Sequence, residues 1–222
     1  MAQLAGKNVL ITGALGTIGQ ALVKRYLEEG ANVFALDLPD APDAQARLDA
    51  IGKGVRYIGC DLGKLEELEV MAKALGDEVG GIDVLVNNAA LVIFKQHDAF
   101  SIQEYEDQVR VNSTAVFVLS RACAEHMKRK KYGKIVNITS LTLTGRWDGY
   151  VPYIASKGAM FGLINVITKS AKDYEGVSLR LEGASLPAYR ASVGFGKQFS
   201  VLGRSFELAL SAEYYDQTGP NF

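Results

Sequence analysis

A tyrosine and a lysine one helical turn apart are the residues best suited to acid–base chemistry in this chain. Tyr153 and Lys157 belong to the segment Tyr-Ile-Ala-Ser-Lys, which opens a helical apolar pattern, so their side chains share one helix face. A phenol titrates at about pH 10, but a neighbouring lysine cation favours the phenolate. The pair is therefore suited to exchanging a proton with an alcohol or carbonyl oxygen. Ser140, at the end of the preceding predicted strand, is placed to hydrogen-bond the same oxygen.

A glycine-rich turn is the second chemical signal. Gly13, Gly16 and Gly19 are spaced three residues apart, where the apolar run 8–11 passes into a helical pattern that stops at Gly30. Such glycines let backbone N–H groups approach a pyrophosphate at the positive end of a helix. The turn therefore predicts a dinucleotide site.

Asp37 carries the prediction of which dinucleotide binds. It ends the second predicted strand, 18 residues after Gly19. A carboxylate about 20 residues beyond such a turn accepts hydrogen bonds from the adenosine ribose. Its charge also repels a 2′-phosphate, so the predicted cofactor is NAD.

The elements that position these residues alternate along the chain. Strands are predicted at 8–11, 32–36, 55–60, 84–86 and 134–138, with helical patterns between them, including 65–79 and 102–130. Right-handed crossovers stack such units into a doubly wound parallel sheet of the Rossmann type, with three αβα layers. No linker or repeat divides the sequence, so a single domain over residues 1–222 is predicted.

Composition restricts the partners of the chain. Lysine and arginine total 24 and aspartate and glutamate 25, a formal net charge of −1, so no global basic field holds nucleic acid or an anionic membrane. Cys60 and Cys123 are too few and too far apart for a disulfide framework. No apolar run approaches the length of about 18 residues that spans a bilayer. We therefore expect a cytoplasmic protein with a small-molecule partner, and no nucleic acid or membrane partner.

From about Leu4 to Gly176 the sequence resembles the short-chain dehydrogenase/reductase family, in its single-domain branch. Five blocks follow the family order. They are the glycine-rich turn, Asp61 after the third strand, Asn-Asn-Ala-Ala at 87–90, Asn112 in the long helix, and Ser140 followed by Tyr153 and Lys157.

The resemblance implies a role for each block. Tyr153 is the expected acid/base; Lys157 is expected to lower its pKa and to bind the nicotinamide ribose, and Asn112 to anchor a proton-relaying water. The implied catalytic set is Asn112, Ser140, Tyr153 and Lys157. The implied cofactor-binding set is Gly13, Gly16, Thr17, Ile18, Gly19, Asp37, Asp61, Leu62, Asn88, Ala89, Tyr153 and Lys157. The family also implies a nicotinamide cofactor, no metal, and a homodimer or homotetramer if the C-terminal part folds.

Two features depart from the family pattern. Thr17 stands where the single-domain branch has glycine or alanine, and Gly16 suits the extended branch that modifies nucleotide sugars. Beyond Gly176, the expected Val-Asn, Pro-Gly and Asp-Gly-Gly motifs vanish together. Val177–Leu181 still reads as one strand, and Arg204–Tyr215 is predicted as an amphipathic helix. We interpret 177–222 as a divergent tail that arose by a shifted reading frame, a splice or local divergence.

The predicted function is an NAD(H)-dependent oxidoreductase that interconverts a secondary alcohol and a carbonyl by hydride transfer. Two alternatives stay open: an NAD-binding protein without turnover because of its altered C-terminus, and a nucleotide-sugar epimerase or dehydratase. Four apolar or aromatic residues are predicted to border the substrate pocket: Val92, Phe94, Trp147 and Tyr150. Such walls suit many substrates, so the sequence does not name one.

Overall fold

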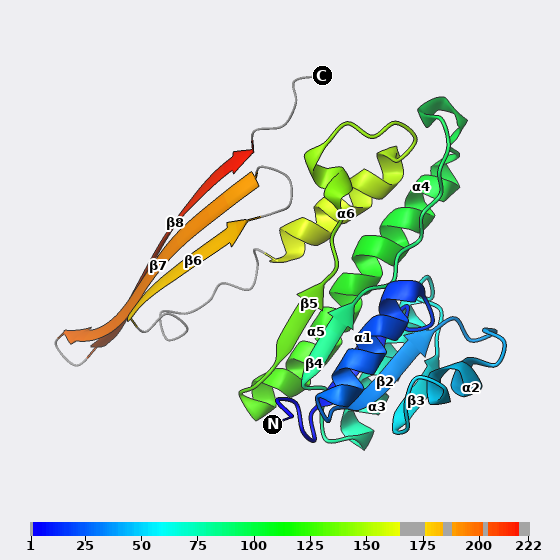
Figure 1. The fold of residues 1–222 in the computed structure, drawn as a ribbon, viewed down its shortest axis with the longest axis horizontal. Helices are drawn as coiled ribbons and strands as arrows, with labels where there is room; N and C mark the ends of the chain where they lie inside the picture. Colours follow the sequence, from blue (N-terminus) through cyan, green and yellow to red (C-terminus); the bar gives the residue numbers. More distant parts are fainter. Residues whose placement is uncertain (1, 165–175, 184–187, 202–203, 218–222) are drawn as a thin grey trace. The chain divides into compact units, whose positions relative to one another are not determined.

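The chain divides into two compact units, Met1–Asn165 and Val166–Phe222. The computed structural model describes residues 2–164, 176–183, 188–201 and 204–217 (Figure 1). The single domain predicted over residues 1–222 stays a prediction.

A five-stranded parallel sheet forms the centre of the first unit and confirms the predicted fold class. Its strands lie in the order β3-β2-β1-β4-β5, so the chain starts in the middle of the sheet and builds outward in both directions. Their bounds are β1 Asn8–Thr12, β2 Asn32–Asp37, β3 Val55–Gly59, β4 Val84–Asn87 and β5 Lys134–Asn137. The order reverses beside β1, the place where open α/β sheets bind ligands at their carboxyl edge.

Helices connect these strands and cover both faces of the sheet (Figure 1). They are α1 Thr17–Glu28, α2 Ala44–Asp49, α3 Leu65–Glu78, α4 Ile102–Val109, α5 Ala115–Lys130 and α6 Val151–Ile164. The helical stretch predicted at 102–130 contains a π-helical turn, Arg110–Thr114, between α4 and α5. Short 3₁₀ turns lie at His97–Ala99 and Leu141–Thr144. No helix in the described ranges is both long and apolar enough to span a membrane.

The core has two layers because alternate strand residues point to opposite faces of the sheet. Leu10 and Leu85 pack in one cluster with side chains of α3 and α5, among them Leu68 and Leu119. The neighbouring strand positions Val9, Ile11, Val84 and Val86 pack in a second cluster, which contains Val23 of α1 and Leu48 of α2. Both faces are buried, which explains the continuous apolar runs of these strands.

The second unit contains an antiparallel sheet of three strands in the order β6-β7-β8. The strands are β6 Gly176–Gly183, β7 Ala188–Val201 and β8 Arg204–Gln217. The strand predicted at Val177–Leu181 is confirmed, whereas the helix predicted at Arg204–Tyr215 is wrong, because β8 occupies that segment. Its apolar residues recur at every second position from Phe206 to Tyr214, the period of a strand rather than of a helix.

Candidate functional site

The glycine-rich turn between β1 and α1 is packed so closely that two of its glycines admit no side chain. Gly13 has a φ of +63°, and a Cβ at this residue would lie 2.8 Å from the Cα of Ala89. A Cβ at Gly19 would lie 2.0 Å from the carbonyl oxygen of Gly13. The turn therefore keeps its backbone at the carboxyl edge of the sheet, next to the end of β4.

The residues after β4 fix this turn through Thr12 and Asn88. The amides of Asn88 and Ala89 both donate to Thr12 Oγ1 at 3.0 Å. Asn88 Nδ2 donates to the carbonyl oxygens of Thr12 and Gly13, at 2.9 and 3.1 Å. Asn88, predicted to face the cofactor side, thus also holds the turn. Sequence reasoning missed the buried Thr12, because a threonine that ends a strand gives no signal of its partners.

Asp37 hydrogen-bonds two backbone amides next to the glycine-rich turn, and its contact with a ribose stays a prediction. Its Oδ2 accepts a hydrogen bond from the Leu15 amide at 2.8 Å, and its Oδ1 accepts one from the Leu38 amide at 2.9 Å. The side chain is half-buried at the end of β2, beside the turn. A carboxylate has about four lone-pair sites, so these two bonds leave others to accept from a ligand.

A cleft of about 620 Å³ runs along this edge of the sheet. Ten of the predicted cofactor-binding residues line it: Gly13, Gly16, Thr17, Ile18, Gly19, Asp37, Asp61, Leu62, Asn88 and Ala89. Its other walls are Ala90, which belongs to the Asn-Asn-Ala-Ala block, and five residues that the sequence did not single out: Leu36, Leu38, Cys60, Leu91 and Val111. The glycine-rich turn at the N-terminus of a helix suits the pyrophosphate of a dinucleotide. The carboxylate beyond the turn suits its ribose, and the apolar walls suit its base.

Tyr153 and Lys157 lie on α6, and the lysine is buried. Lys157 is 1% exposed, its Nζ donates to the Ile138 carbonyl at 2.9 Å, and Nζ lies 5.8 Å from the centroid of the Tyr153 ring. Burial lowers the pKa of Lys157 from 10.5 to about 8. The structure thus brings the predicted pair together and holds the amine in a state that gains or loses a proton near neutral pH.

Asn112 lies in the π-helical turn and joins the cleft to α6. Its Oδ1 accepts from the Leu91 amide at 2.7 Å, and its Nδ2 donates to Leu91 O at 2.8 Å and to Ser156 Oγ at 3.0 Å. Ser156 Oγ in turn donates to the Tyr153 carbonyl at 2.7 Å. The cleft wall and the tyrosine helix are therefore parts of one site. The water-anchoring role of Asn112 stays a prediction.

Ser140 is less directly connected than the other predicted catalytic residues. It precedes the 3₁₀ turn Leu141–Thr144, and its Oγ accepts from the Thr142 amide at 3.2 Å and lies 2.9 Å from Thr142 Oγ1. Within the described residues, its side-chain hydrogen bonds stay inside this turn. Its contact with a substrate oxygen stays a prediction.

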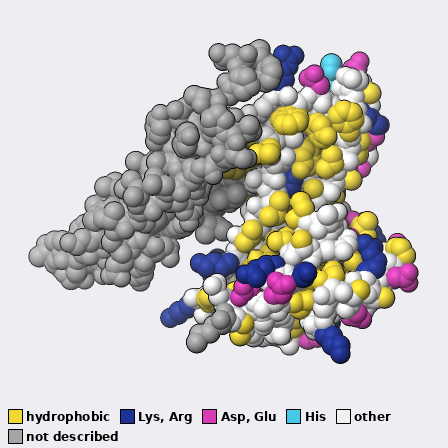
Figure 2. All heavy atoms as spheres, viewed as in Figure 1, with side chains coloured by type: hydrophobic (Ala, Val, Ile, Leu, Met, Phe, Trp, Pro, Cys, Tyr) yellow, Lys and Arg dark blue, Asp and Glu magenta, His cyan; other side chains and the backbone are white. Residues whose placement is uncertain are grey.

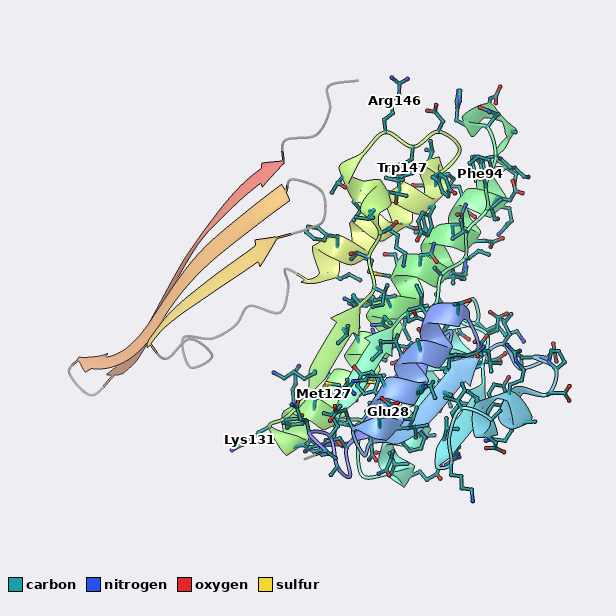
Figure 3. All side chains as sticks on the ribbon, in the orientation of Figure 1. Glu28, Phe94, Met127, Lys131, Arg146 and Trp147 are labelled. Atoms are coloured by element: carbon teal, nitrogen blue, oxygen red, sulfur yellow. The ribbon has the colours of Figure 1, made fainter. Side chains whose placement is uncertain are left out.

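An exposed apolar surface lies around the start of α6, and hydrophobic side chains gather at this end of the unit (Figure 2). Figure 3 places Phe94 and Trp147 near the start of this helix. The ring centroids of Phe94 and Tyr150 are 5.1 Å apart, and those of Tyr150 and Tyr153 are 6.1 Å apart. Two of the predicted wall residues are thus linked by aromatic contacts to Tyr153, the predicted acid/base.

Comparison with known proteins assigns the family of the chain. The family model for short chain dehydrogenases matches residues 7–181, and the chain belongs to this family. It is 32% identical over 186 residues to D-threitol dehydrogenase of Mycolicibacterium smegmatis, covering 82% of this chain and 70% of the relative. It is 35% identical over 160 residues to 5-keto-D-gluconate 5-reductase of Escherichia coli, covering 71% and 63%. The chain thus spans about two thirds of the length of these relatives.

A solved structure agrees with this assignment. It comes from Beutenbergia cavernae and is described as an NAD(P)-dependent gluconate 5-dehydrogenase with bound NADP at low occupancy. The match has a TM-score of 0.70 and 30% sequence identity, and it covers 78% of this chain and 68% of that one.

Proposed function

We propose that the protein is an NAD(H)-dependent oxidoreductase that interconverts a secondary alcohol and a carbonyl compound. The observation that carries this proposal is the side chain of Asn112. It bonds Leu91 in the wall of the dinucleotide cleft and Ser156 on the helix of Tyr153 and Lys157. A cofactor site and a proton-transfer pair are therefore held at one place, as hydride transfer between a nicotinamide and an alcohol carbon requires.

The residues of this chain supply proton management and orientation. A bound nicotinamide cofactor supplies the acceptor or donor of the hydride. Tyr153 takes the proton of the alcohol hydroxyl during oxidation and returns one to the carbonyl oxygen during reduction. Lys157 lies beside Tyr153 and, with its pKa lowered by burial to about 8, takes up or releases a proton near neutral pH. Ser140 orients the substrate oxygen.

We propose NAD(H) as the preferred cofactor because of Asp37. Its carboxylate borders the cleft and suits a free ribose diol, whereas a 2′-phosphate there would meet a like charge. We expect NAD(H) to bind at least about tenfold more tightly than NADP(H), a difference of about 1.4 kcal/mol. Fluorescence titration of both reduced cofactors measures this preference, and Asp37→Ala is expected to narrow it. Equal affinities for the unmodified protein would refute the assignment.

The decisive experiment is a screen of purified protein against small secondary alcohols and ketones, including polyols and keto acids. Turnover is detected by the change in NADH absorbance. Turnover of any member supports the proposed function. If NAD(H) binds but no member of the panel is turned over, the result favours the first alternative, an NAD-binding protein without turnover. NAD⁺ that stays tightly bound through purification, with no net oxidation, favours an epimerase or dehydratase.

A further inference from the structure

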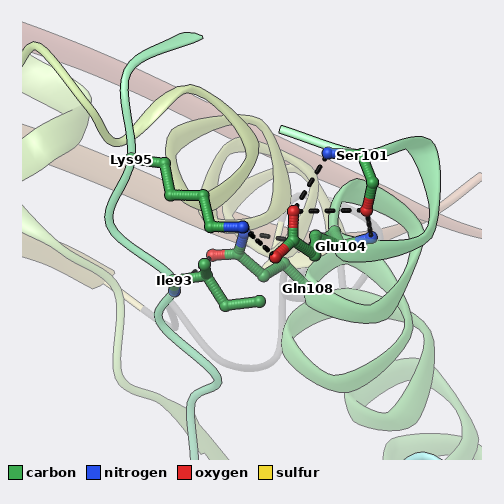
Figure 4. Close-up of polar contacts among 5 residues, drawn as sticks. All are labelled: Ile93, Lys95, Ser101, Glu104 and Gln108. Carbon is green, nitrogen blue, oxygen red and sulfur yellow. Dashed lines mark hydrogen bonds and ion pairs between the residues drawn. The ribbon is translucent and has the colours of Figure 1, made fainter. Parts of the chain in front are cut away.

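Three polar side chains on one helix face hold the irregular segment Leu91–Lys95 that follows β4. Glu104, Gln108 and Asn112 are spaced four residues apart across α4 and the π-helical turn. Asn112 bonds both the amide and the carbonyl of Leu91, at 2.7 and 2.8 Å. The other two bond the next odd-numbered residues of the segment, Ile93 and Lys95 (Figure 4). We call this set the helix clamp.

Gln108 is the middle member of the helix clamp and is completely buried. Its Oε1 accepts a hydrogen bond from the Ile93 amide at 3.2 Å, and its Nε2 donates to the Glu104 carbonyl at 3.4 Å. Burying an amide side chain is unfavourable unless it is hydrogen-bonded. Its oxygen therefore fixes the main chain at Ile93, and its removal would leave that amide without its partner.

Glu104 fixes the far end of the segment. It forms a capping box with Ser101, in which Glu104 Oε2 accepts from the Ser101 amide at 3.0 Å and Ser101 Oγ accepts from the Glu104 amide at 3.1 Å. Its Oε1 pairs with Lys95 Nζ (Figure 4). The Lys95 amide donates to the Gly149 carbonyl at 3.3 Å, which ties the segment to the loop before α6.

The clamp determines where the even-numbered residues point. Leu91, Ile93 and Lys95 are partly buried, whereas Val92 and Phe94 are 47% and 65% exposed. Phe94 lies against Gly149, where an added Cβ would come within 2.5 Å of its ring, and against Tyr150. Tyr150 contacts Tyr153 in turn. A continuous path of contacts therefore leads from Gln108 through Phe94 to the acid–base tyrosine.

We propose that Gln108 is a positioning residue for substrate binding. By holding the Ile93 amide, it sets Val92 and Phe94 as an apolar wall beside Tyr153, which suits a substrate that presents a hydrocarbon or C–H face. It touches neither the dinucleotide cleft nor the reacting atoms. This inference rests on the proposed function and adds a residue that controls affinity for the alcohol or ketone while leaving cofactor binding unchanged.

The test replaces Gln108 by a residue of similar volume without the acceptor oxygen. For Gln108→Met we expect the KM of the alcohol found in the screen to rise about tenfold, with kcat changed less than about threefold. The affinity for NADH stays unchanged. Gln103→Met, on the exposed face of the same helix, is the matched control and changes neither constant.

A double-mutant cycle links Gln108 to its target. If Gln108 acts through the wall, Phe94→Ala raises KM to a similar extent. The KM of the double variant is then no higher than that of the single variant with the higher KM. Additive effects would overturn the proposal. So would an unchanged KM in Gln108→Met, or equal losses of NADH and substrate affinity, which indicate a general structural role.

Hydrogen exchange provides a readout that does not need turnover. Gln108→Met is expected to speed amide exchange in residues 91–95 and to leave β1 and β4 protected, whereas Gln103→Met changes neither. Uniform or unchanged exchange would overturn the proposal. Absence of turnover by the unmodified protein would instead count against the proposed function, and local exchange in Gln108→Met would still show what Gln108 holds.

Discussion

Lys157, a predicted catalytic residue, lies in an environment that is unfavourable for its charge. Its ammonium is almost completely buried, with the Ile138 carbonyl as its hydrogen-bond acceptor in the described part of the chain. Burial disfavours the charged form, which is why the pKa falls from 10.5 to about 8. Below pH 8 the folded protein therefore holds a charge that is better solvated in the unfolded chain.

This cost predicts that Lys157→Met stabilises the protein while it removes activity. The pKa difference corresponds to an upper limit of about 3 kcal/mol, and loss of the bond to Ile138 reduces the net gain to about 1 to 2 kcal/mol. The gain is full below pH 8. Between pH 8 and 10.5 the folded protein has released the Lys157 proton, whereas the unfolded chain still holds it. The stability of the wild type therefore rises with pH, and the stability difference between the variant and the wild type disappears. Urea unfolding at pH 7 and pH 10 measures it, and lower stability of the variant at pH 7 would contradict this reasoning.

Tyr153 is expected to govern turnover and not cofactor affinity. Tyr153→Phe removes the oxygen that carries the proton and keeps the ring that packs near Tyr150, so we expect a loss of at least about 100-fold in kcat with little change in NADH binding. Lys157→Ala serves as the contrast and is expected to weaken both. Steady-state rates and NADH titrations on the same preparations decide between them, and substantial residual turnover in Tyr153→Phe would refute its acid–base role.

At the scale of elements, the turn between β1 and α1 distinguishes two kinds of glycine. Gly19→Ala would place a methyl group 2.0 Å from the Gly13 carbonyl, and we expect a loss of at least about 3 kcal/mol of stability. Gly16 has a φ of −73° and leaves 3.4 Å to the same oxygen, so Gly16→Ala is expected to change stability by less than about 1 kcal/mol. Thermal unfolding of both variants compares them. Similar stability losses would show that the turn is less closely packed than described.

Sequence patterns predicted the first unit well because each of its signals is local. Buried parallel strands read as apolar runs, and Gly13 and Asp37 stand at the ends of two of them. The π-helical turn and the role of Gln108 were not predictable, because their partners, Leu91 and Ile93, lie 15 or more residues earlier. The error at Arg204–Tyr215 has a different cause. A helix was inferred there although the apolar residues alternate with a period of two.

At the scale of the whole molecule, the kind of sheet changes along the sequence near the end of the family match. The match extends to residue 181, and the antiparallel sheet begins with β6 at Gly176. The parallel sheet follows the family up to β5, and the remaining described strands form a separate sheet. This change of architecture supports our proposal that the segment after Gly176 differs in origin. This proposal is tested by translating the gene beyond codon 176 in its other reading frames. If a frame was lost, one of them encodes an Asn-Ala-x-x-Pro-Gly-like stretch.

The position of β5 has a consequence for handling the protein in solution. β5 forms one border of the parallel sheet, and its outer side has no strand partner among the described residues. Unpaired backbone groups on an edge strand form a template for pairing with strands of other molecules, which leads to aggregation. Val136, 38% exposed on β5, lies two residues after the exposed Lys134, which already discourages such pairing. We therefore expect Val136→Lys to increase the soluble yield and to lower light scattering on warming, and Lys134→Val to have the opposite effects. Equal scattering by the wild type and both variants would show that this border does not drive association.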